Sequence, residues 1–254
     1  MEENLLRSSL YLNKVAISKP IPRGNYLEKL PIVANLKKMG GLEFSRPVTF
    51  FVGENGVGKS TLIEGIAVAM GFNPEGGTVN FSFSTKESHS DLHEYLTVSR
   101  GYKRHKDGFF LRAESFYNVA SNIDDMDSEP GIGAKIISGY GGVSLHKQSH
   151  GESFMALVEN RFYGNGLYIL DEPEAALSPM RLMRLMYCMK ELVNKNSQFI
   201  ISTHSPILMT FPDAEVLEIT QDGIWSVDYK ETEHFMITKR FMDAPEKIVK
   251  DLLG

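Results

Sequence analysis

The sequence has one cysteine, one tryptophan and no apolar run near the length of a membrane span. A single cysteine, Cys188, cannot form a disulfide within the chain, which is typical of a protein that folds in a reducing compartment. The polar start, residues 1–14, lacks the apolar stretch of a secretory signal. A net charge of -5 excludes a surface that is basic throughout. We therefore expect a cytoplasmic protein without membrane insertion, in which any contact with nucleic acid is local.

The composition is that of a globular protein, with 42% hydrophobic and 23% charged residues over 254 positions. No repeat or linker divides the sequence, so we expect a single domain over residues 1–254. Apolar runs predict strands at residues 10–17, 47–52, 109–113, 167–170 and 199–202. Helical spacing of apolar residues predicts helices at residues 60–70, 152–162 and 180–192. This alternation predicts an α/β domain with a mostly parallel core sheet.

A glycine-rich segment follows the strand predicted at residues 47–52. It reads Gly53, Glu54, Asn55, Gly56, Val57, Gly58, Lys59 and Ser60, which fits the P-loop pattern GxxxxGK[ST] without a gap. In that pattern backbone N–H groups surround phosphates, the lysine binds the β- and γ-phosphate oxygens, and the serine hydroxyl is a ligand of Mg²⁺. The predicted helix adds the positive end of its dipole, with Thr61 as a helix-start residue near the nucleotide. An apolar strand before the loop and a helix after it favour a nucleotide site over a chance glycine-rich turn.

Two carboxylates follow the strand predicted at residues 167–170. They are Asp171 and Glu172, and Pro173 then ends the strand. An acidic turn would be the better interpretation of this pattern alone. Beside a P-loop, an aspartate at this place holds Mg²⁺ and an adjacent glutamate polarises the attacking water as a general base. We therefore predict Asp171 as a metal-side residue and Glu172 as the base.

His204 follows the strand predicted at residues 199–202. Because the carboxyl ends of parallel strands share a crevice with the ligand, we expect His204 to hydrogen-bond the γ-phosphate and to sense its loss. A lone histidine is more often structural, but this position favours the functional interpretation. The other six histidines have no convincing metal-ligand spacing; they are His89, His93, His105, His146, His150 and His234.

Residues 149–152 read Ser-His-Gly-Glu before a predicted helix, with Ser149 as its N-cap. Alone, an ordinary capped helix would explain this turn. In chain order, however, the P-loop, this turn, the acidic strand end, the segment 174–179 and His204 resemble the motifs of soluble ABC-type ATPases. That class includes SMC-related and RecF-like chromosome and repair proteins. The sequence is similar above all to small, stand-alone bacterial ATPases of the predicted AAA family, over nearly its whole length.

The resemblance implies ATP and Mg²⁺ as ligands and a head-to-tail homodimer on ATP binding. ATP would lie between the P-loop of one subunit and Ser149 and Gly151 of the other. It also implies an antiparallel β portion and a small helical subdomain at approximately residues 85–165. Fewer than about 90 residues separate Ser60 from Ser149, too few for a long coiled coil.

Two features depart from the transporter members of the class. The signature is Ser-His-Gly-Glu, where transporters have Ser-Gly-Gly-Gln. The second departure concerns the Q-loop, because Gln148 is the only glutamine between the P-loop and Ser149. Both departures favour an ATPase that acts on DNA or in a toxin or defence system. The alternative is the nucleotide-binding subunit of a membrane transporter. A switch that binds ATP without turnover needs no base, so Glu172 argues against it.

Two further segments carry predictions of their own. Residues 100–106, from Arg100 to Lys106, concentrate positive charge around one tyrosine and predict the tip of a hairpin. A solvated tip is the preferred interpretation, and contact with DNA or an acidic protein partner is the alternative. Residues 244–253 predict a short amphipathic helix that packs on the core.

Overall fold

The computed structural model describes residues 10–78, 90–113, 116, 121, 137, 139, 142, 144, 146 and 148–254. Part of the helical subdomain expected at approximately residues 85–165 therefore lies outside the described residues. Of that region, the described part includes a short antiparallel strand and the helix that carries the Ser-His-Gly-Glu turn.

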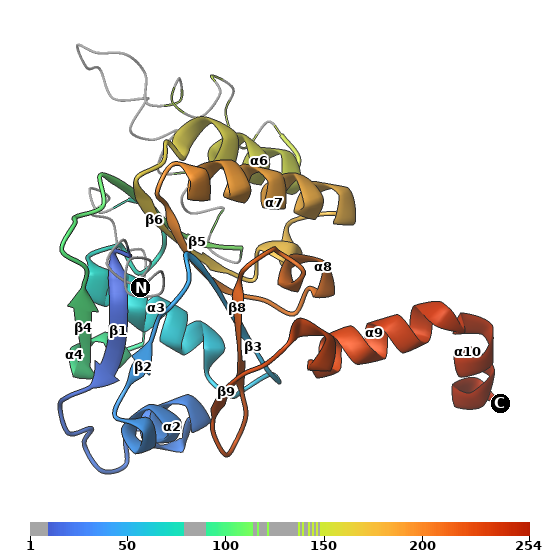
Figure 1. Ribbon diagram of the computed structural model, residues 1–254, viewed down its shortest axis with the longest axis horizontal. Coiled ribbons are helices and arrows are strands. Elements are labelled where there is room, and N and C mark those ends of the chain that lie inside the picture. Colours follow the sequence, from blue (N-terminus) through green and yellow to red (C-terminus); the bar gives the residue numbers. More distant parts are fainter. Residues whose placement is uncertain are drawn as a thin grey trace.

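The centre of the molecule is a six-stranded sheet with the order β5-β6-β7-β3-β8-β9 (Figure 1). Its strands are β3 Val48–Val52, β5 Asp107–Arg112, β6 Gly166–Asp171, β7 Gln198–Ser202, β8 Glu215–Ile219 and β9 Ile224–Ser226. Neighbouring strands run parallel, except that β9 is antiparallel to β8. The mostly parallel core sheet predicted from the sequence is confirmed.

Both faces of this sheet are buried. Phe50 and Phe51 are neighbours in β3, and each is 0% exposed. Phe50 packs in the cluster formed with α6, α7 and α8, whereas Phe51 packs in the cluster formed with α2 and α3. The helices are α2 Pro31–Met39, α3 Lys59–Met70, α6 His150–Arg161, α7 Pro179–Asn194 and α8 Pro206–Met209. Since successive side chains of a strand point to opposite faces, burial on both sides gives the continuous apolar runs by which these strands were predicted.

A second sheet has three antiparallel strands in the order β2-β1-β4. The elements around it are β1 Leu12–Ile17, η1 Tyr26–Lys29, β2 Leu42–Glu43, α4 Leu92–Tyr95 and β4 Leu96–Arg100. The buried side chain of Gln198 in β7 joins the sheets, because its amide oxygen accepts from the N–H groups of Tyr11 and Leu12 at 2.9 Å. The expected antiparallel β portion is therefore present.

The predicted hairpin around residues 100–108 is wrong. β4 pairs with β1 in the small sheet, while β5 pairs in parallel with β6 in the large one. Residues 101–106 cross from one sheet to the other, with the Gly101 N–H donating to Tyr11 O and the Lys106 N–H donating to Asn165 O. The apolar residues of β5 are buried between two helical layers, a position that pairing with the half-exposed β4 would not provide.

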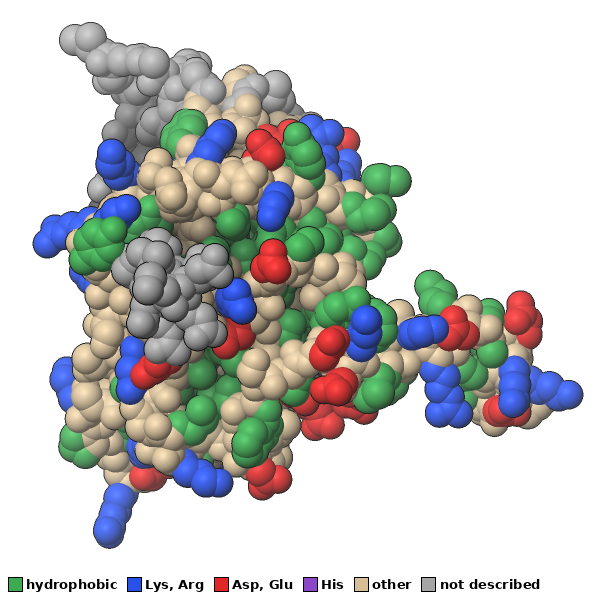
Figure 2. Space-filling model, in the orientation of Figure 1, with side chains coloured by type: hydrophobic (Ala, Val, Ile, Leu, Met, Phe, Trp, Pro, Cys, Tyr) green, Lys and Arg blue, Asp and Glu red, His purple; other side chains and the backbone are tan. Residues whose placement is uncertain are grey.

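The expected packing of residues 244–253 on the core is also wrong. Helices α9 Glu233–Asp243 and α10 Pro245–Leu253 form an arm that projects from the body (Figure 1). Neither helix has a buried residue, and Leu253 is 82% exposed. Hydrophobic side chains and charges of both signs lie on its surface (Figure 2). The other helices already cover both faces of the large sheet, which leaves no core face for this arm. Within the described residues, no helix is long and apolar enough to cross a membrane.

Candidate nucleotide site

The glycine-rich loop lies between β3 and α3, and its glycines adopt a left-handed or related backbone. Their φ angles are 137° at Gly53, 85° at Gly56 and 99° at Gly58. A Cβ on Gly53 would lie 2.2 Å from the carbonyl oxygen of Ile219 in β8, and one on Gly58 would lie 2.4 Å from Ile32 in α2. A Cβ on Gly56 would meet nothing within 4 Å. The loop therefore needs glycine for space at two positions and for backbone conformation at three.

Lys59 is the first residue of α3 and is buried, with 4% of its surface exposed. Its Nζ donates to the carbonyl oxygens of Gly53 at 2.8 Å and Glu54 at 2.9 Å. Burial lowers the pKa of its ammonium, and the nearby carboxylates, led by Glu172, oppose that shift. The ammonium is therefore bound to the start of the loop, beside the N-terminus of α3. The first N–H groups of that helix have no partner inside the helix.

Asp171 is the last residue of β6 and is 6% exposed. The Ser202 hydroxyl, at the end of β7, donates to its Oδ1, and Arg112 Nε lies 3.3 Å from its Oδ2. The same guanidinium forms an ion pair with the buried Glu64 of α3. The prediction missed Arg112 and Glu64. The available signal was a charged residue at the end of an apolar strand, the same signal that identified Asp171.

Glu172 follows with a left-handed backbone, at φ 48° and ψ 55°. Its N–H donates to the carbonyl oxygen of Ser202 at 3.1 Å, and the short helix Pro173–Ala175 (η4) begins after it. Its side chain is 39% exposed, and Oε1 lies 3.5 Å from His204 Nε2. The chain turn at the end of β6 therefore directs the carboxylate toward the end of β7.

His204 lies just beyond β7, as predicted. Burial, followed by the charge of Lys59 and the ring of His234, lowers the pKa of His204 to about 4. Its backbone N–H donates to the carboxylate of Glu174 in η4. Its Nδ1 is 2.7 Å from Nε2 of His234. At neutral pH the imidazole of His204 is therefore neutral and hydrogen-bonded.

His234 was set aside in the sequence and is the main residue that the prediction missed. It lies in the first turn of α9 and reaches back to the end of β7. Together with Glu233 it also lines a cavity of about 280 Å³ beside the P-loop residues Gly53 and Glu54. A pairing between residues of two such distant segments has no local sequence pattern, because it depends on where the arm begins.

Ser149 caps α6 as predicted. The Glu152 N–H donates to the Ser149 side chain, and the Ser149 N–H donates to Glu152 Oε2 at 3.0 Å, which forms a capping box. The Ser149 hydroxyl also donates to Oε2, at 2.6 Å. A Cβ on Gly151 would lie 2.8 Å from the carbonyl oxygen of Ala176 and 2.7 Å from Arg181. Gly151 therefore lets α6 approach the segment before α7. Among the described residues, the contacts of exposed Ser149 stay within α6 and do not reach the P-loop.

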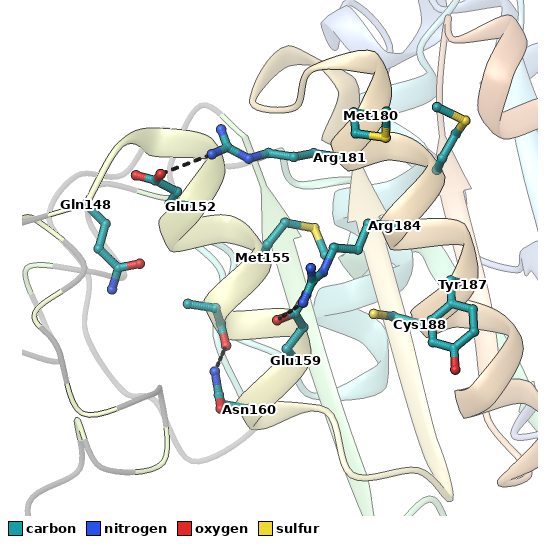
Figure 3. Close-up of a pocket in the computed structure, with 12 residues that line it drawn as sticks. Gln148, Glu152, Met155, Glu159, Asn160, Met180, Arg181, Arg184, Tyr187 and Cys188 are labelled. Carbon is teal, nitrogen blue, oxygen red and sulfur yellow. Dashed lines mark hydrogen bonds and ion pairs between the residues drawn. The ribbon is translucent and has the colours of Figure 1, made fainter.

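A larger cavity, about 1330 Å³, lies between α6 and α7 (Figure 3). Ion pairs between Arg181 and Glu152 and between Arg184 and Glu159 cross it. Its remaining lining is largely apolar and includes Met155, Met180, Tyr187 and Cys188. None of the residues that line this groove belongs to the glycine-rich loop.

The donor set suits Mg²⁺. The hydroxyl of Ser60 and the carboxylate of Asp171 are hard oxygen donors, which Mg²⁺ prefers. The described part of the chain holds no group of three or more His, Cys, Asp or Glu side chains that would bind a metal ion alone. A sparse oxygen set fits Mg²⁺, which keeps several waters and takes its other ligands from substrate phosphates.

Two known families match separate parts of the chain. Residues 37–123, which include the P-loop, match a family described as "AAA domain". Residues 147–210 match a family described as "AAA domain, putative AbiEii toxin, Type IV TA system". Together the two matches span the P-loop and the ends of β6 and β7. The second segment contains Ser149, Asp171, Glu172 and His204. The predicted α/β P-loop fold, with its mixed sheet, is confirmed.

Several solved structures are similar to this chain. One is cbiO1 from Clostridium perfringens, part of the ABC transporter complex cbiONQ, with 19% identity over 93% of this chain and 96% of that one, at a TM-score of 0.47. Another is the SMC head domain from Thermotoga maritima, with 18% identity over 74% and 92%, at 0.40. A third is a dimeric bacterial ABC transporter cassette, with 15% identity over 72% and 86%, at 0.43. No curated protein has a sequence that matches this chain.

Proposed function

We propose that the chain binds ATP and hydrolyses it to ADP and phosphate. The observation that carries this proposal is the meeting of Lys59, Glu172 and His204, which come from three separate segments of the chain. The negative charge of Glu172 raises the pKa of the Lys59 ammonium. Oε1 of the same carboxylate lies 3.5 Å from His204 Nε2. A cation for phosphate, a carboxylate for water and an imidazole N–H for the transferred phosphoryl group are the groups that this hydrolysis uses.

Each group has one task in the reaction. Lys59 exchanges the carbonyl oxygens of Gly53 and Glu54 for the β- and γ-phosphate oxygens of ATP. Glu172 orients a water and accepts its proton as the water oxygen attacks the γ-phosphorus and the bond to the β-phosphate oxygen breaks. His204 donates a hydrogen bond to the γ-phosphate. Ser60 and Asp171 would hold Mg²⁺, which neutralises phosphate charge when bound.

The proposed active form is a head-to-tail homodimer that assembles on ATP binding. Ser149 is exposed at the N-terminus of α6, where N–H groups and the helix dipole favour an anion. Its contacts among the described residues do not reach the P-loop of its own chain. In the proposed dimer, Ser149 and Gly151 of one subunit therefore complete the site of the other.

The proposed biological setting is a defence or DNA-related process in the cytoplasm. The description of the family that matches residues 147–210 names a toxin of a toxin–antitoxin system, and this supports the defence role. The segment from Arg100 to Lys106 is the proposed contact with DNA or an acidic partner protein. Its Tyr102 is 71% exposed, with the Lys103 ammonium 5.3 Å from the ring centroid. An exposed aromatic beside cations suits nucleic acid.

The substitution Glu172→Gln tests the proposal. Without a general base we expect turnover to fall by about 100-fold or more, because proton transfer contributes roughly that factor. ATP binding should persist, so that the variant accumulates as an ATP-bound dimer in light scattering. The matched control is Glu191→Gln, an exposed change on α7, which should turn over at the wild-type rate. Wild-type turnover by Glu172→Gln, or no turnover by the unaltered protein with Mg²⁺ and ATP, would overturn the proposal.

A further inference from the structure

Two histidines meet side by side at the edge of the proposed ATP site. His204 Nδ1 and His234 Nε2 are 2.7 Å apart, and the ring centroids are 4.7 Å apart with 55° between the planes. At this separation a single proton lies between the two nitrogens, so one ring donates and the other accepts. The direction of this hydrogen bond decides which nitrogen of His204 carries its proton.

The second nitrogen of His204 points at the reacting groups. Its Nε2 lies 3.5 Å from Glu172 Oε1, a group that accepts hydrogen bonds. The pKa of His204 is lowered to about 4, so the neutral ring has only one N–H. If that N–H is at Nε2, then Nδ1 is the acceptor and His234 must be the donor. A proton at Nδ1 would instead leave two acceptors facing each other at Glu172.

His234 is held in place independently of His204. Thr232 is 0% exposed and caps α9, with its hydroxyl donating to Tyr229 O at 2.7 Å and accepting from the Phe235 N–H at 3.4 Å. His234 follows in the first turn of the helix, and the rest of α9 projects away from the body (Figure 1). The donor is therefore anchored where the arm joins the site.

We propose that His234 is a positioning residue for ATP hydrolysis: its Nε2–H donates to Nδ1 of His204 and keeps the proton of His204 on Nε2. That proton is then directed at Glu172 and, in the complex, at the γ-phosphate. This inference rests on the proposed ATPase function. His234 acts through His204 and does not itself touch the nucleotide. It also makes the start of the projecting arm part of the site.

The tautomers can be measured without nucleotide, so this first test does not depend on the ATPase proposal. Nitrogen NMR of the full chain with isotope-labelled histidine should show both His204 and His234 protonated at Nε2 near neutral pH. In His234→Phe, the signal of His204 should move toward a mixture of its two tautomers. A proton on Nδ1 of His204 in the unaltered protein would overturn the proposal.

Kinetics provide the second test. We expect His234→Phe to lower kcat by about tenfold, with the KM for ATP changed less than about twofold, as for loss of an outer-shell partner. His234→Gln should recover most of kcat, because its amide N–H can replace the imidazole donor. His93→Gln, on α4, is the matched control and should behave as wild type. Circular dichroism checks that each variant is folded.

The possible failures can be told apart. If the unaltered protein does not hydrolyse ATP, the proposed function fails while the NMR result still decides the direction of the histidine pair. If the unaltered protein is active and His234→Phe retains its kcat, the positioning role is wrong. Equal loss in His234→Phe and folded His234→Gln would likewise contradict it, because the donor would then be irrelevant.

Discussion

Glu172 has a left-handed backbone conformation, at φ 48° and ψ 55°, which residues other than glycine rarely adopt. Such a residue costs of order 1–2 kcal/mol. The surrounding structure supports it, since the Glu172 N–H donates to Ser202 O at 3.1 Å and the rigid ring of Pro173 follows. The backbone of the proposed base is thus held by a main-chain hydrogen bond, which does not depend on the side chain.

The first prediction uses this strain. Glu172→Gly and Glu172→Gln should both lose turnover, but the glycine variant should have a free energy of unfolding about 1 kcal/mol higher than the glutamine variant. Urea denaturation of both proteins measures the difference. At the control position Glu191, an exposed helical residue of α7, glycine should be the less stable of the same pair. If the glycine variant were the less stable of the pair at both positions, Glu172 would carry no backbone strain.

The residues of the site differed in how well the sequence revealed them. Asp171, Glu172 and His204 each stand at the end of an apolar strand, and that position alone placed them together. Arg112 also ends a strand, but its ion pairs with Asp171 of β6 and Glu64 of α3 became visible only in the fold. His234 had no local signal, because its contact depends on the direction in which α9 leaves the body.

At the scale of elements, the turn between β3 and α3 packs closely against β8 because Gly53 has no side chain. Gly53 approaches the carbonyl of Ile219 in β8, whereas Gly56 faces open space. We expect Gly53→Ala to lower the free energy of unfolding by about 3 kcal/mol or more, because strand and loop must separate. Gly56→Ala should cost only about 1 kcal/mol, from its φ of 85°. Thermal denaturation separates the two, and equal costs would contradict the close packing at Gly53.

A second contact between elements predicts the response to acid. Asp107, at the start of β5, accepts from Arg161 Nη1 at 2.7 Å, from the Tyr168 hydroxyl at 2.7 Å and from the Tyr163 N–H at 3.0 Å. Burial raises the pKa of its carboxyl, but these hydrogen bonds outweigh burial and leave the pKa below its ordinary value. A lowered folded-state pKa stabilises the protein fully above the unfolded-state value near about 4, and the gain disappears as the pH falls through the folded-state pKa.

Asp107→Asn should therefore lower the free energy of unfolding by about 2 kcal/mol at neutral pH. Its deficit relative to the unaltered protein should shrink as the pH falls below about 4. Chemical denaturation at a series of pH values measures both effects. Asp222→Asn, on an exposed turn, should show neither. A deficit that does not change with pH would mean that the charge of Asp107 does not stabilise the fold.

For the molecule as a whole, local apolar patterns predicted the strands and helices, whereas contacts between distant segments were missed. Strands buried on both faces, such as β3 and β7, stand out as apolar runs. The hairpin prediction failed because β4 and β5 choose partners in different sheets, β1 and β6, according to tertiary packing. The projecting arm was missed because an amphipathic helix has the same pattern whether its apolar face is covered or exposed.

The last prediction concerns two copies of the molecule. If ATP lies between Lys59 of one subunit and Ser149 of the other, Lys59→Met and Ser149→Asp should each be inactive alone. Aspartate keeps the N-cap of α6 while placing negative charge against the γ-phosphate. In an equal mixture, half of the dimers are mixed and each contains one intact site, so about a quarter of wild-type turnover should return. A chain carrying both changes restores no site with either single variant and is the control. A mixture that stays inactive would place Ser149 and Lys59 in the same subunit's site, and an active Ser149→Asp variant would place Ser149 outside it.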